Sequence, residues 1–288
     1  MTLVERLNAY EKLMRLDKPI GALLLLWPAL WGLWFAASGL PPLDLLIIFV
    51  AGTVLVRSAG CVINDFADRD FDPHVARTRD RPLAARMIPP WEALALAGVL
   101  LLAAFAFVLH TNRLTIMLSF VALALTAIYP FLKRVFSFPQ AWLGIAFGFS
   151  IPMAYAAQLE SVPAVAWVSM IANMFWAIAY DTEYAMVDRD DDVRIGVKSS
   201  AILLGRHDAA GVMTSHVIFL LLMTMVGGWQ KMGALYYVGL ALAAFLVYQQ
   251  YRLIRTRERD ACFKAFLHNN RVGLVIFVGL ASDLYFKS

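Results

Sequence analysis

The stretch of sequence that most constrains the fold covers residues 45–72 and reads LLIIFVAGTVLVRSAGCVINDFADRDFD. Residues 45–63 are apolar apart from a few small or polar side chains and one arginine. A membrane-spanning helix needs about 20 mainly apolar residues, so this part predicts a transmembrane helix. The nine residues that follow contain four aspartates. The stretch therefore predicts a membrane helix that ends in a cluster of carboxylates.

The composition of the whole chain agrees with a membrane location. Of the 288 residues, 61% are hydrophobic and 16% are charged, whereas a soluble domain carries about 25% charged residues. A chain this apolar has too little polar surface to cover a water-soluble globule. The expected surroundings are membrane lipid, and no nucleic-acid partner is expected.

Apolar stretches long enough to cross a membrane recur along the chain. We identify nine of them, at residues 19–40, 45–63, 93–109, 114–132, 141–157, 162–180, 209–229, 232–248 and 272–286. The last is the weakest, because it is short and contains Asp283. We therefore predict an all-α membrane protein in which residues 1–288 form a single domain with nine transmembrane helices.

Lys and Arg residues are distributed unevenly between the two sides of these predicted helices. The N-terminal segment and every second loop hold 21 of the 25, and the other side holds three. Cytoplasmic loops of membrane proteins carry an excess of Lys and Arg. The N-terminus is therefore predicted to be cytoplasmic and the C-terminus to lie on the opposite side. Residues 3–14 alternate apolar and charged side chains and predict an amphipathic helix on the membrane surface.

The first acidic cluster follows the apolar stretch 45–63 on the predicted cytoplasmic side. Asn64, Asp68 and Asp72 recur at positions i, i+4 and i+8. Residues with this spacing share one face of a helix, so all three are predicted to lie on a helix that extends from the membrane span. Asp70 breaks the spacing and is predicted to face solvent.

A second acidic cluster follows the apolar stretch 162–180 on the same predicted side. Four of its residues repeat every three or four positions, namely Asp181, Tyr184, Asp188 and Asp192. This spacing again predicts one face of a continuing helix. Asp190 and Asp191 break the spacing and are predicted to face solvent.

Both clusters stack like charges, and such pairs destabilise a helix unless cations lie between them. Mg²⁺ suits this role, because it binds one or two carboxylates and completes its shell with water and phosphate oxygens. We therefore predict two Mg²⁺ sites in which the ligands are Asn64, Asp68 and Asp72 for one ion, and Asp188 and Asp192 for the other. The alternative interpretation of each cluster is a solvated charge run. The matching spacing and the shared membrane side favour metal binding.

Basic residues in the same loops can take up the remaining negative charge of a phosphate-containing substrate. The candidates are Arg77, Arg79, Arg81, Lys133, Arg134 and Lys198. Arg57 is different, because it lies inside the apolar stretch on the face that carries Asn64. An ionisable residue inside the membrane normally faces a cavity and marks function, and a guanidinium can bind a carboxylate through two hydrogen bonds. A structural ion pair is the alternative for Arg57.

Together these residues resemble the UbiA superfamily of intramembrane aromatic prenyltransferases, and most of all its bacterial branch that acts on 4-hydroxybenzoate. The family signature N-D-x-x-D-x-x-x-D is met at residues 64–72, and D-x-x-Y-A-x-x-D-x-x-x-D at residues 181–192. Further stretches that are similar to the family cover residues 17–21, 77–83, 129–134 and 184–199. The resemblance implies nine helices around a central cavity, with the acidic motifs at its cytoplasmic end.

The resemblance also implies an activity. The substrates would be a polyprenyl diphosphate and 4-hydroxybenzoate, the cofactor Mg²⁺, the pathway ubiquinone biosynthesis and the location a bacterial inner membrane. Arg57 would orient the acceptor carboxylate, so that the ring carbon ortho to the hydroxyl meets the prenyl cation. Asp181 or a phosphate oxygen would remove the proton, with Asp188 also catalytic. Asn64 and Tyr184 would contact the substrates.

Two other functions remain open from the sequence. Prenylation of another quinone precursor, such as 1,4-dihydroxy-2-naphthoate, would need the same residues. An ion-coupled transporter also needs intramembrane charges, although transporter sites tend to lie near the bilayer midplane. A membrane CDP-alcohol phosphotransferase is disfavoured, because its signature Asp-Gly-x-x-Ala-Arg does not occur in the sequence.

Overall fold

The computed structural model describes residues 2–74, 78–196 and 198–287, without the side chains of residues 130, 131, 133–135 and 195. Every regular element in these ranges is a helix. In chain order the elements are α1 (Leu3–Leu13), α2 (Ile20–Ala37), α3 (Leu43–Asp68), the 3-10 helix η1 (Asp72–His74), α4 (Pro90–Val108), α5 (Arg113–Val135), α6 (Pro139–Gly148), α7 (Ser150–Leu159), α8 (Ala164–Ile195), α9 (Ser200–Leu204), the 3-10 helix η2 (Gly205–His207), α10 (Asp208–Trp229), α11 (Ala234–Ile254) and α12 (Arg259–Tyr285).

Each of the nine predicted apolar stretches coincides with helix. The fifth, residues 141–157, is divided between α6 and α7, which meet at Phe149. Pro152 accounts for the break, because proline has no N–H to bond the carbonyl four residues earlier, at Gly148. Within the described residues, six helical stretches are long and apolar enough to cross a membrane. The chain is therefore an all-α, multi-pass membrane protein.

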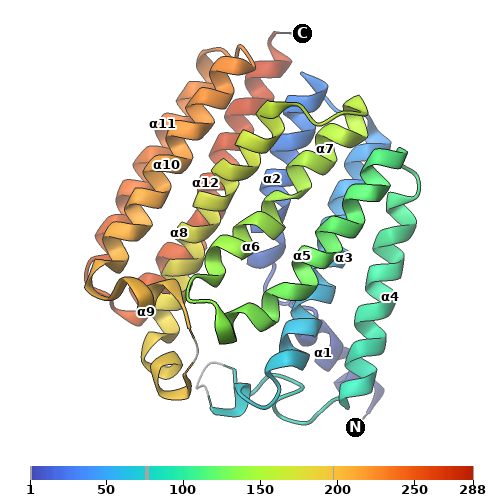
Figure 1. Ribbon diagram of the computed structural model, residues 1–288, viewed down its shortest axis with the longest axis vertical. Coiled ribbons are helices and arrows are strands. Elements are labelled where there is room, and N and C mark those ends of the chain that lie inside the picture. Colours follow the sequence, from blue (N-terminus) through green and yellow to red (C-terminus); the bar gives the residue numbers. More distant parts are fainter. Residues whose placement is uncertain (1, 75–77, 197, 288) are drawn as a thin grey trace.

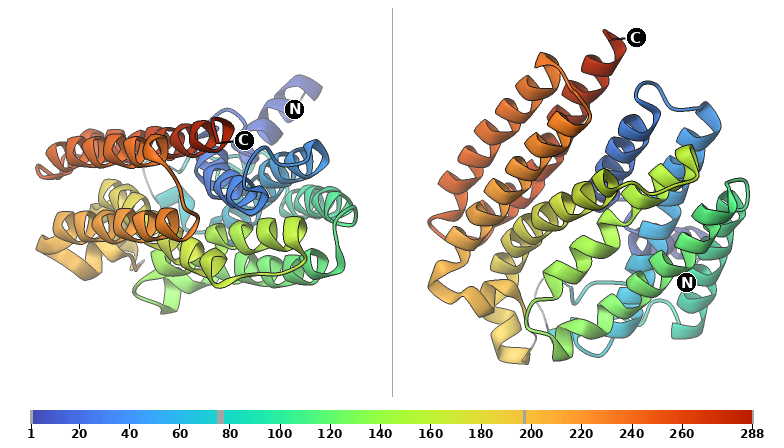
Figure 2. Two further views of the ribbon diagram at one scale, coloured as in Figure 1. Left: turned by 90° about the horizontal axis from the view of Figure 1, so that it is seen from above. Right: turned by 45° about the horizontal axis from the view of Figure 1, so that its top comes forward.

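The helices form one bundle with the two chain ends at opposite poles. Figure 1 shows the N-terminus, α1 and the connection from α3 to α4 at the lower pole, and the C-terminus at the upper pole. Seen end-on in Figure 2, α2 lies near the middle, with α10, α11 and α12 on one side and α3 and α4 on the other. α2 also contacts α3, α7 and α12. Its central position explains why most of its side chains are buried.

An aromatic cluster joins three helices in the core. Trp31 of α2, Trp176 of α8 and Phe219 of α10 are all buried. The ring centroids of Trp31 and Trp176 are 5.2 Å apart, and those of Trp176 and Phe219 are 5.7 Å apart. Aromatic pairs at such distances add about 0.5–1.5 kcal/mol to the contribution of their buried area. The cluster therefore fixes how α2, α8 and α10 pack.

The predicted amphipathic helix at the N-terminus is confirmed as α1. Thr2 and Glu5 form a capping box at its start, and the side chains of Arg6 and Tyr10 both bond Glu92 of α4. Its apolar side chains Leu3 and Val4 remain 75% and 66% exposed. Exposed apolar side chains at the start of a helix suit contact with lipid, and a membrane-surface position for α1 stays a prediction.

Small residues bring α11 and α12 close together. A Cβ atom added to Gly239 would lie 2.8 Å from the carbonyl oxygen of Val275 and 3.1 Å from the Cα atom of Gly279. Close helix approach at small residues is a common packing mode in membranes.

We predict that Gly239→Ala lowers the melting temperature of the detergent-purified protein, because backbone atoms of α12 would have to move.

The matched control for this prediction is Gly228→Ala near the end of α10, where an added Cβ meets no atom within 4 Å. Alanine forms helix better than glycine by about 1 kcal/mol, so this variant is expected to be at least as stable as the unaltered protein. Equal melting temperatures for the two variants would contradict the packing argument.

Candidate active site

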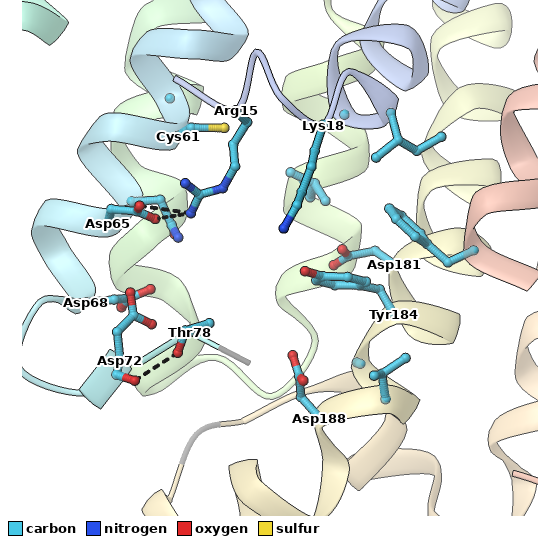
Figure 3. Close-up of a pocket in the computed structure, with 18 of the residues that line it drawn as sticks. Arg15, Lys18, Cys61, Asp65, Asp68, Asp72, Thr78, Asp181, Tyr184 and Asp188 are labelled. Atoms are coloured by element: carbon cyan, nitrogen blue, oxygen red, sulfur yellow. Dashed lines mark hydrogen bonds and ion pairs between the residues drawn. The ribbon is translucent and has the colours of Figure 1, made fainter. Parts of the chain in front are cut away.

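A cavity of about 1070 Å³ lies between α2, α3, α6 and α8. Both predicted acidic clusters line it. From the first cluster come Asn64, Asp65, Asp68 and Asp72, and from the second come Asp181, Tyr184, Asp188, Asp191 and Asp192. Figure 3 shows Asp65, Asp68 and Asp72 on one wall and Asp181, Tyr184 and Asp188 on the other. The structure therefore brings together two segments that lie more than 100 residues apart in the chain.

The first cluster does not lie on one helix, and that prediction is wrong. α3 ends at Asp68, and Asp72 begins the 3-10 helix η1. Pro73 accounts for the difference, because the residue before a proline is disfavoured in the α conformation. Asp72 still lines the cavity. The turn is held by Thr78, whose hydroxyl donates to the carbonyl oxygen of Asp72 over 2.9 Å.

The second cluster lies on one unbroken helix, as predicted. α8 continues to Ile195 and ends at Gly196, which has φ 73°. A left-handed glycine is a common helix terminus. Asp190 faces solvent as predicted, with its side chain 77% exposed. The prediction for Asp191 is wrong: its side chain is 14% exposed, lines the cavity and lies 3.4 Å from the guanidinium of Arg259.

Two arginines hold the carboxylates of the first cluster. Nη2 of Arg15 donates to both oxygens of Asp65 at 2.8 Å. Nη1 of Arg81 donates to Asp65 at 3.0 Å and to Asp72 at 2.9 Å. Arg81 was predicted as a substrate contact, and in this structure it joins two carboxylates. The carboxylate of Asp65, which is 1% exposed, is thereby hydrogen-bonded to two arginines.

Asp72 lies in a crowded acidic environment. Burial raises the pKa of its carboxyl group, the charge of Arg81 opposes the rise, and the neighbouring carboxylates Asp65 and Asp68 add to it. A bound cation would relieve both effects, since an opposite charge favours the ionised form. The electrostatics of this wall therefore suit a cation ligand.

Arg57 projects from α3 toward the start of α2. Gly21 provides the room for it, because a Cβ atom there would lie 2.5 Å from Nε of Arg57. The guanidinium lies 5.7 Å from the ring centroid of Phe147, a favourable distance for a cation above an aromatic face. Its Nε atom is buried and has no hydrogen-bond partner among the described residues. Arg57 and Asn64 both line the cavity, as their shared helix face predicts.

A second hollow of about 230 Å³ adjoins the main cavity between the segment before α2 and the side of α3. Arg15, Lys18, Gly21 and Arg57 line both spaces. Most other residues that line the hollow are apolar, namely Met14, Leu16, Pro19, Ala22 and Val54. Its described lining contains three basic side chains and no carboxylate. The hollow is therefore suited to a small apolar molecule with an acid group.

The structure describes only some of the basic residues that were predicted to contact the substrate. Lys198 lines the cavity. Arg77 lies outside the described residues, and the side chains of Lys133 and Arg134 are not described. Four further basic residues line the cavity without having been predicted from the sequence, namely Lys12, Arg15, Lys18 and Arg259. In Figure 3 the side chain of Lys18 points into the space between the two acidic walls.

Tyr184 separates the acidic part of the cavity from an aromatic part. Its ring centroid is 4.7 Å from that of Phe266 and 6.4 Å from that of Phe263, both on α12. Apolar lining continues with Leu24, Leu143 and Phe147. The cavity thus combines a carboxylate-rich region with an apolar region, an arrangement that suits a ligand with a charged head and a hydrocarbon tail.

Known proteins are similar to this chain in sequence and in fold. A relative from Nitrosospira multiformis is 62% identical over 98% of both chains, and one from Azoarcus sp. is 60% identical over 98% of this chain and 99% of the other; both are called 4-hydroxybenzoate octaprenyltransferase. A solved UbiA homolog from Aeropyrum pernix superposes with a TM-score of 0.80 at 27% identity, covering 91% of this chain and 97% of that one.

A UbiA homolog from Archaeoglobus fulgidus, solved bound to GPP and Mg²⁺, superposes with a TM-score of 0.69. It is 16% identical, over 95% of this chain and 99% of that one, and at this identity the likeness concerns the fold. Residues 25–272 of the present sequence match the UbiA prenyltransferase family. With a family match over most of its length and relatives about 60% identical over nearly all of it, this chain belongs to the UbiA prenyltransferase family.

Proposed function

We propose that this protein transfers a polyprenyl group from its diphosphate to the ring carbon ortho to the hydroxyl of 4-hydroxybenzoate, in ubiquinone biosynthesis. The observation that carries the proposal is the meeting of two acidic clusters, from α3 with η1 and from α8, in one cavity that also contains Arg57. The name shared by the relatives supports this acceptor and a donor of eight isoprene units.

The residues on the two walls fit Mg²⁺. Asn64, Asp68 and Asp72 on one wall, and Asp188 and Asp192 on the other, offer the hard oxygen donors that Mg²⁺ prefers. Among the described residues, no three acidic, histidine or cysteine side chains converge closely enough to hold an ion alone. This agrees with ions that take one or two carboxylates each and share the phosphate oxygens of the substrate. When bound, the metal supplies neutralisation of the charge that develops on the leaving diphosphate.

The donor would lie with its diphosphate between the acidic walls. The proposed basic contacts to its phosphate oxygens are Arg77, Arg81, Lys133, Arg134 and Lys198. For Arg81 this requires an exchange of partners, from the carboxylates of Asp65 and Asp72 to phosphate. The prenyl tail would follow the apolar lining past Tyr184, which is continuous with the acidic part of the cavity.

The acceptor would lie against Arg57. The adjoining hollow has an apolar body and basic side chains at its border with the main cavity, which suits a single aromatic ring with a carboxylate. A guanidinium binds a carboxylate through two parallel hydrogen bonds, and this fixes the orientation of the ring as well as its position. Gly21 supports the arrangement because only a residue without a Cβ leaves the guanidinium in this place.

The chemistry follows from these positions. As the bond between the diphosphate and the allylic carbon breaks, the ring carbon held by Arg57 attacks that carbon. Asp181, on the α8 wall, would accept the ring proton and restore aromaticity, and the neighbouring Asp188 would help to hold the diphosphate. The apolar lining excludes water that would otherwise capture the allylic cation as an alcohol.

The membrane topology is part of the proposal. We infer nine crossing helices formed by one domain over residues 1–288, with the N-terminus in the cytoplasm and the C-terminus in the periplasm. The excess of Lys and Arg near the acidic clusters supports this orientation. A bacterial inner membrane and a surrounding of membrane lipid follow from the same proposal.

We predict that Asp188→Ala lowers the initial rate of prenylation by about 10²–10³-fold, the loss typical when one group that stabilises developing charge is removed. The measurement is the rate of formation of prenylated 4-hydroxybenzoate by mass spectrometry, with geranyl diphosphate and Mg²⁺. Asp190→Ala on the same helix is the control, because that side chain is 77% exposed and is expected to be dispensable. Full activity of folded Asp188→Ala would exclude a role for the second cluster.

Arg57→Lys is predicted to raise the KM for 4-hydroxybenzoate by about 10- to 100-fold, because loss of a bidentate, charge-assisted pair costs about 1.5–3 kcal/mol. The KM for geranyl diphosphate should stay unchanged. Gly21→Ala should act in the same direction by displacing the guanidinium, whereas Gly52→Ala should be neutral, since an added Cβ there meets no atom within 4 Å. An unchanged acceptor KM in Arg57→Lys would refute the role of this arginine.

Competition between acceptors separates the two closest activities. With equal concentrations of 4-hydroxybenzoate and 1,4-dihydroxy-2-naphthoate, we expect the prenylated benzoate to predominate, because relatives about 60% identical to this chain are named for 4-hydroxybenzoate. If the prenylated naphthoate predominates, the proposed prenyl transfer stands but its acceptor is the naphthoate.

A further inference from the structure

Behind the second acidic cluster lies a group of polar side chains that the proposed chemistry does not use. Trp176 and Glu183 of α8 and Asn269 of α12 are all fully buried, each with 0% exposure. None of the three is among the residues that line the cavity. Buried polar groups of this kind cost free energy unless they are hydrogen-bonded, so their arrangement calls for a physical reason.

The side-chain amide of Asn269 bonds two residues of α8 that lie two helical turns apart. The side-chain oxygen of Asn269 accepts a hydrogen bond from the indole N–H of Trp176 at 3.0 Å. Its nitrogen donates to Oε2 of Glu183 at 2.7 Å. Trp176 and Glu183 are seven residues apart and therefore lie on the same face of the helix. The indole N–H can only donate, so it must meet the amide oxygen of Asn269, and this leaves the amide nitrogen to donate to Glu183.

This face of α8 is turned away from the catalytic cavity. At about 100° per residue, Asp181 lies about 160° and Asp188 about 140° around the helix from Glu183. Both aspartates line the cavity, and Glu183 does not. A rotation of α8 by one residue position would carry Asp181 and Asp188 out of the cavity. The rotational setting of α8 about its axis therefore decides where the carboxylates point.

We propose that Asn269 is a positioning residue for the second acidic cluster: by bonding both Trp176 and Glu183 it fixes the rotation of α8, and so turns Asp181 and Asp188 into the cavity. The inference rests on the proposed function of that cluster. Its strength comes from burial. No water replaces a lost partner cheaply in this interior, so the removal of one partner leaves a buried polar group unpaired and destabilises the native arrangement of α8. Oε1 of Glu183 already has no hydrogen-bond partner among the described residues, although Nε2 of His216 lies 3.9 Å away.

The chain contains a matched control at the next position. Oδ1 of Asn270 accepts a hydrogen bond from the indole N–H of Trp27 at 2.9 Å. The donor and acceptor groups equal those of the Trp176–Asn269 bond, and both asparagines lie on α12. Trp27, however, belongs to α2, so this bond does not hold the helix that carries the second cluster.

The test compares Asn269→Leu with Asn270→Leu in detergent-purified full-length protein. Thermal unfolding is measured first, and both variants are expected to melt below the unaltered protein. Binding of geranyl diphosphate in the presence of Mg²⁺ is then measured by isothermal titration calorimetry. We expect Asn269→Leu to weaken this binding about tenfold and to raise the Mg²⁺ concentration for half-maximal rate, with the KM for 4-hydroxybenzoate unchanged. Asn270→Leu should bind as the unaltered protein does.

A second pair of variants keeps the proposal testable if Asn269→Leu does not fold. Glu183→Gln retains an acceptor oxygen for Asn269 and should bind geranyl diphosphate normally, whereas Glu183→Leu should reproduce the tenfold loss. If the two variants of either pair bind geranyl diphosphate equally well, while the unaltered protein prenylates 4-hydroxybenzoate, the positioning role is overturned and the proposed function stands. No Mg²⁺-dependent binding of geranyl diphosphate by the unaltered protein would overturn both this inference and the proposed function.

Discussion

Carboxylates from two distant segments line one cavity, and their negative charges must be compensated for this arrangement to be stable. Like charges at short range raise the free energy of the folded state unless cations or hydrogen bonds compensate. On the α3 wall the compensation comes from Arg15 and Arg81, which bond Asp65 and Asp72. On the α8 wall Arg259 lies 3.4 Å from Asp191. These contacts hold the carboxylates in place and leave the cavity suited to metal ions and a diphosphate.

The two walls are held by different means, and this has consequences for function. The α3 wall depends on arginines from the segment after α1 and from the connection before α4, so its geometry follows these two connecting segments. The α8 wall depends on packing inside the bundle, through the aromatic cluster around Trp176 and the bridge made by Asn269. A substrate that draws Arg81 from Asp72 to a phosphate would therefore change the first wall while the second stays fixed.

Much of the architecture follows from local rules that can be applied to the sequence. The nine apolar stretches coincide with helices because helix is the structure in which a lone segment satisfies its own backbone groups in lipid. The 3–4 spacing from Asp181 to Asp192 was enough to place that cluster on one face of α8. The same rule failed at Asp72, because Pro73 favours a turn that helical spacing alone does not reveal.

The remaining features depend on contacts between residues far apart in the chain. The bond between Arg15 and Asp65 joins positions 50 residues apart, and that between Asn269 and Glu183 joins positions 86 apart. Asp191 was expected to face solvent because its spacing is irregular, but Arg259 approaches it from the start of α12 and helps to bury it. Gly21 gave no signal of its own, since its role depends on the guanidinium that packs against it.

The most direct test of the account is the reaction itself. Purified protein in liposomes is given 4-hydroxybenzoate and geranyl diphosphate, with Mg²⁺ or with EDTA, and the product is analysed by mass spectrometry and by NMR of the ring. We expect a Mg²⁺-dependent gain of one geranyl group on the carbon ortho to the hydroxyl. Folded protein that prenylates no aromatic acid under these conditions would contradict it.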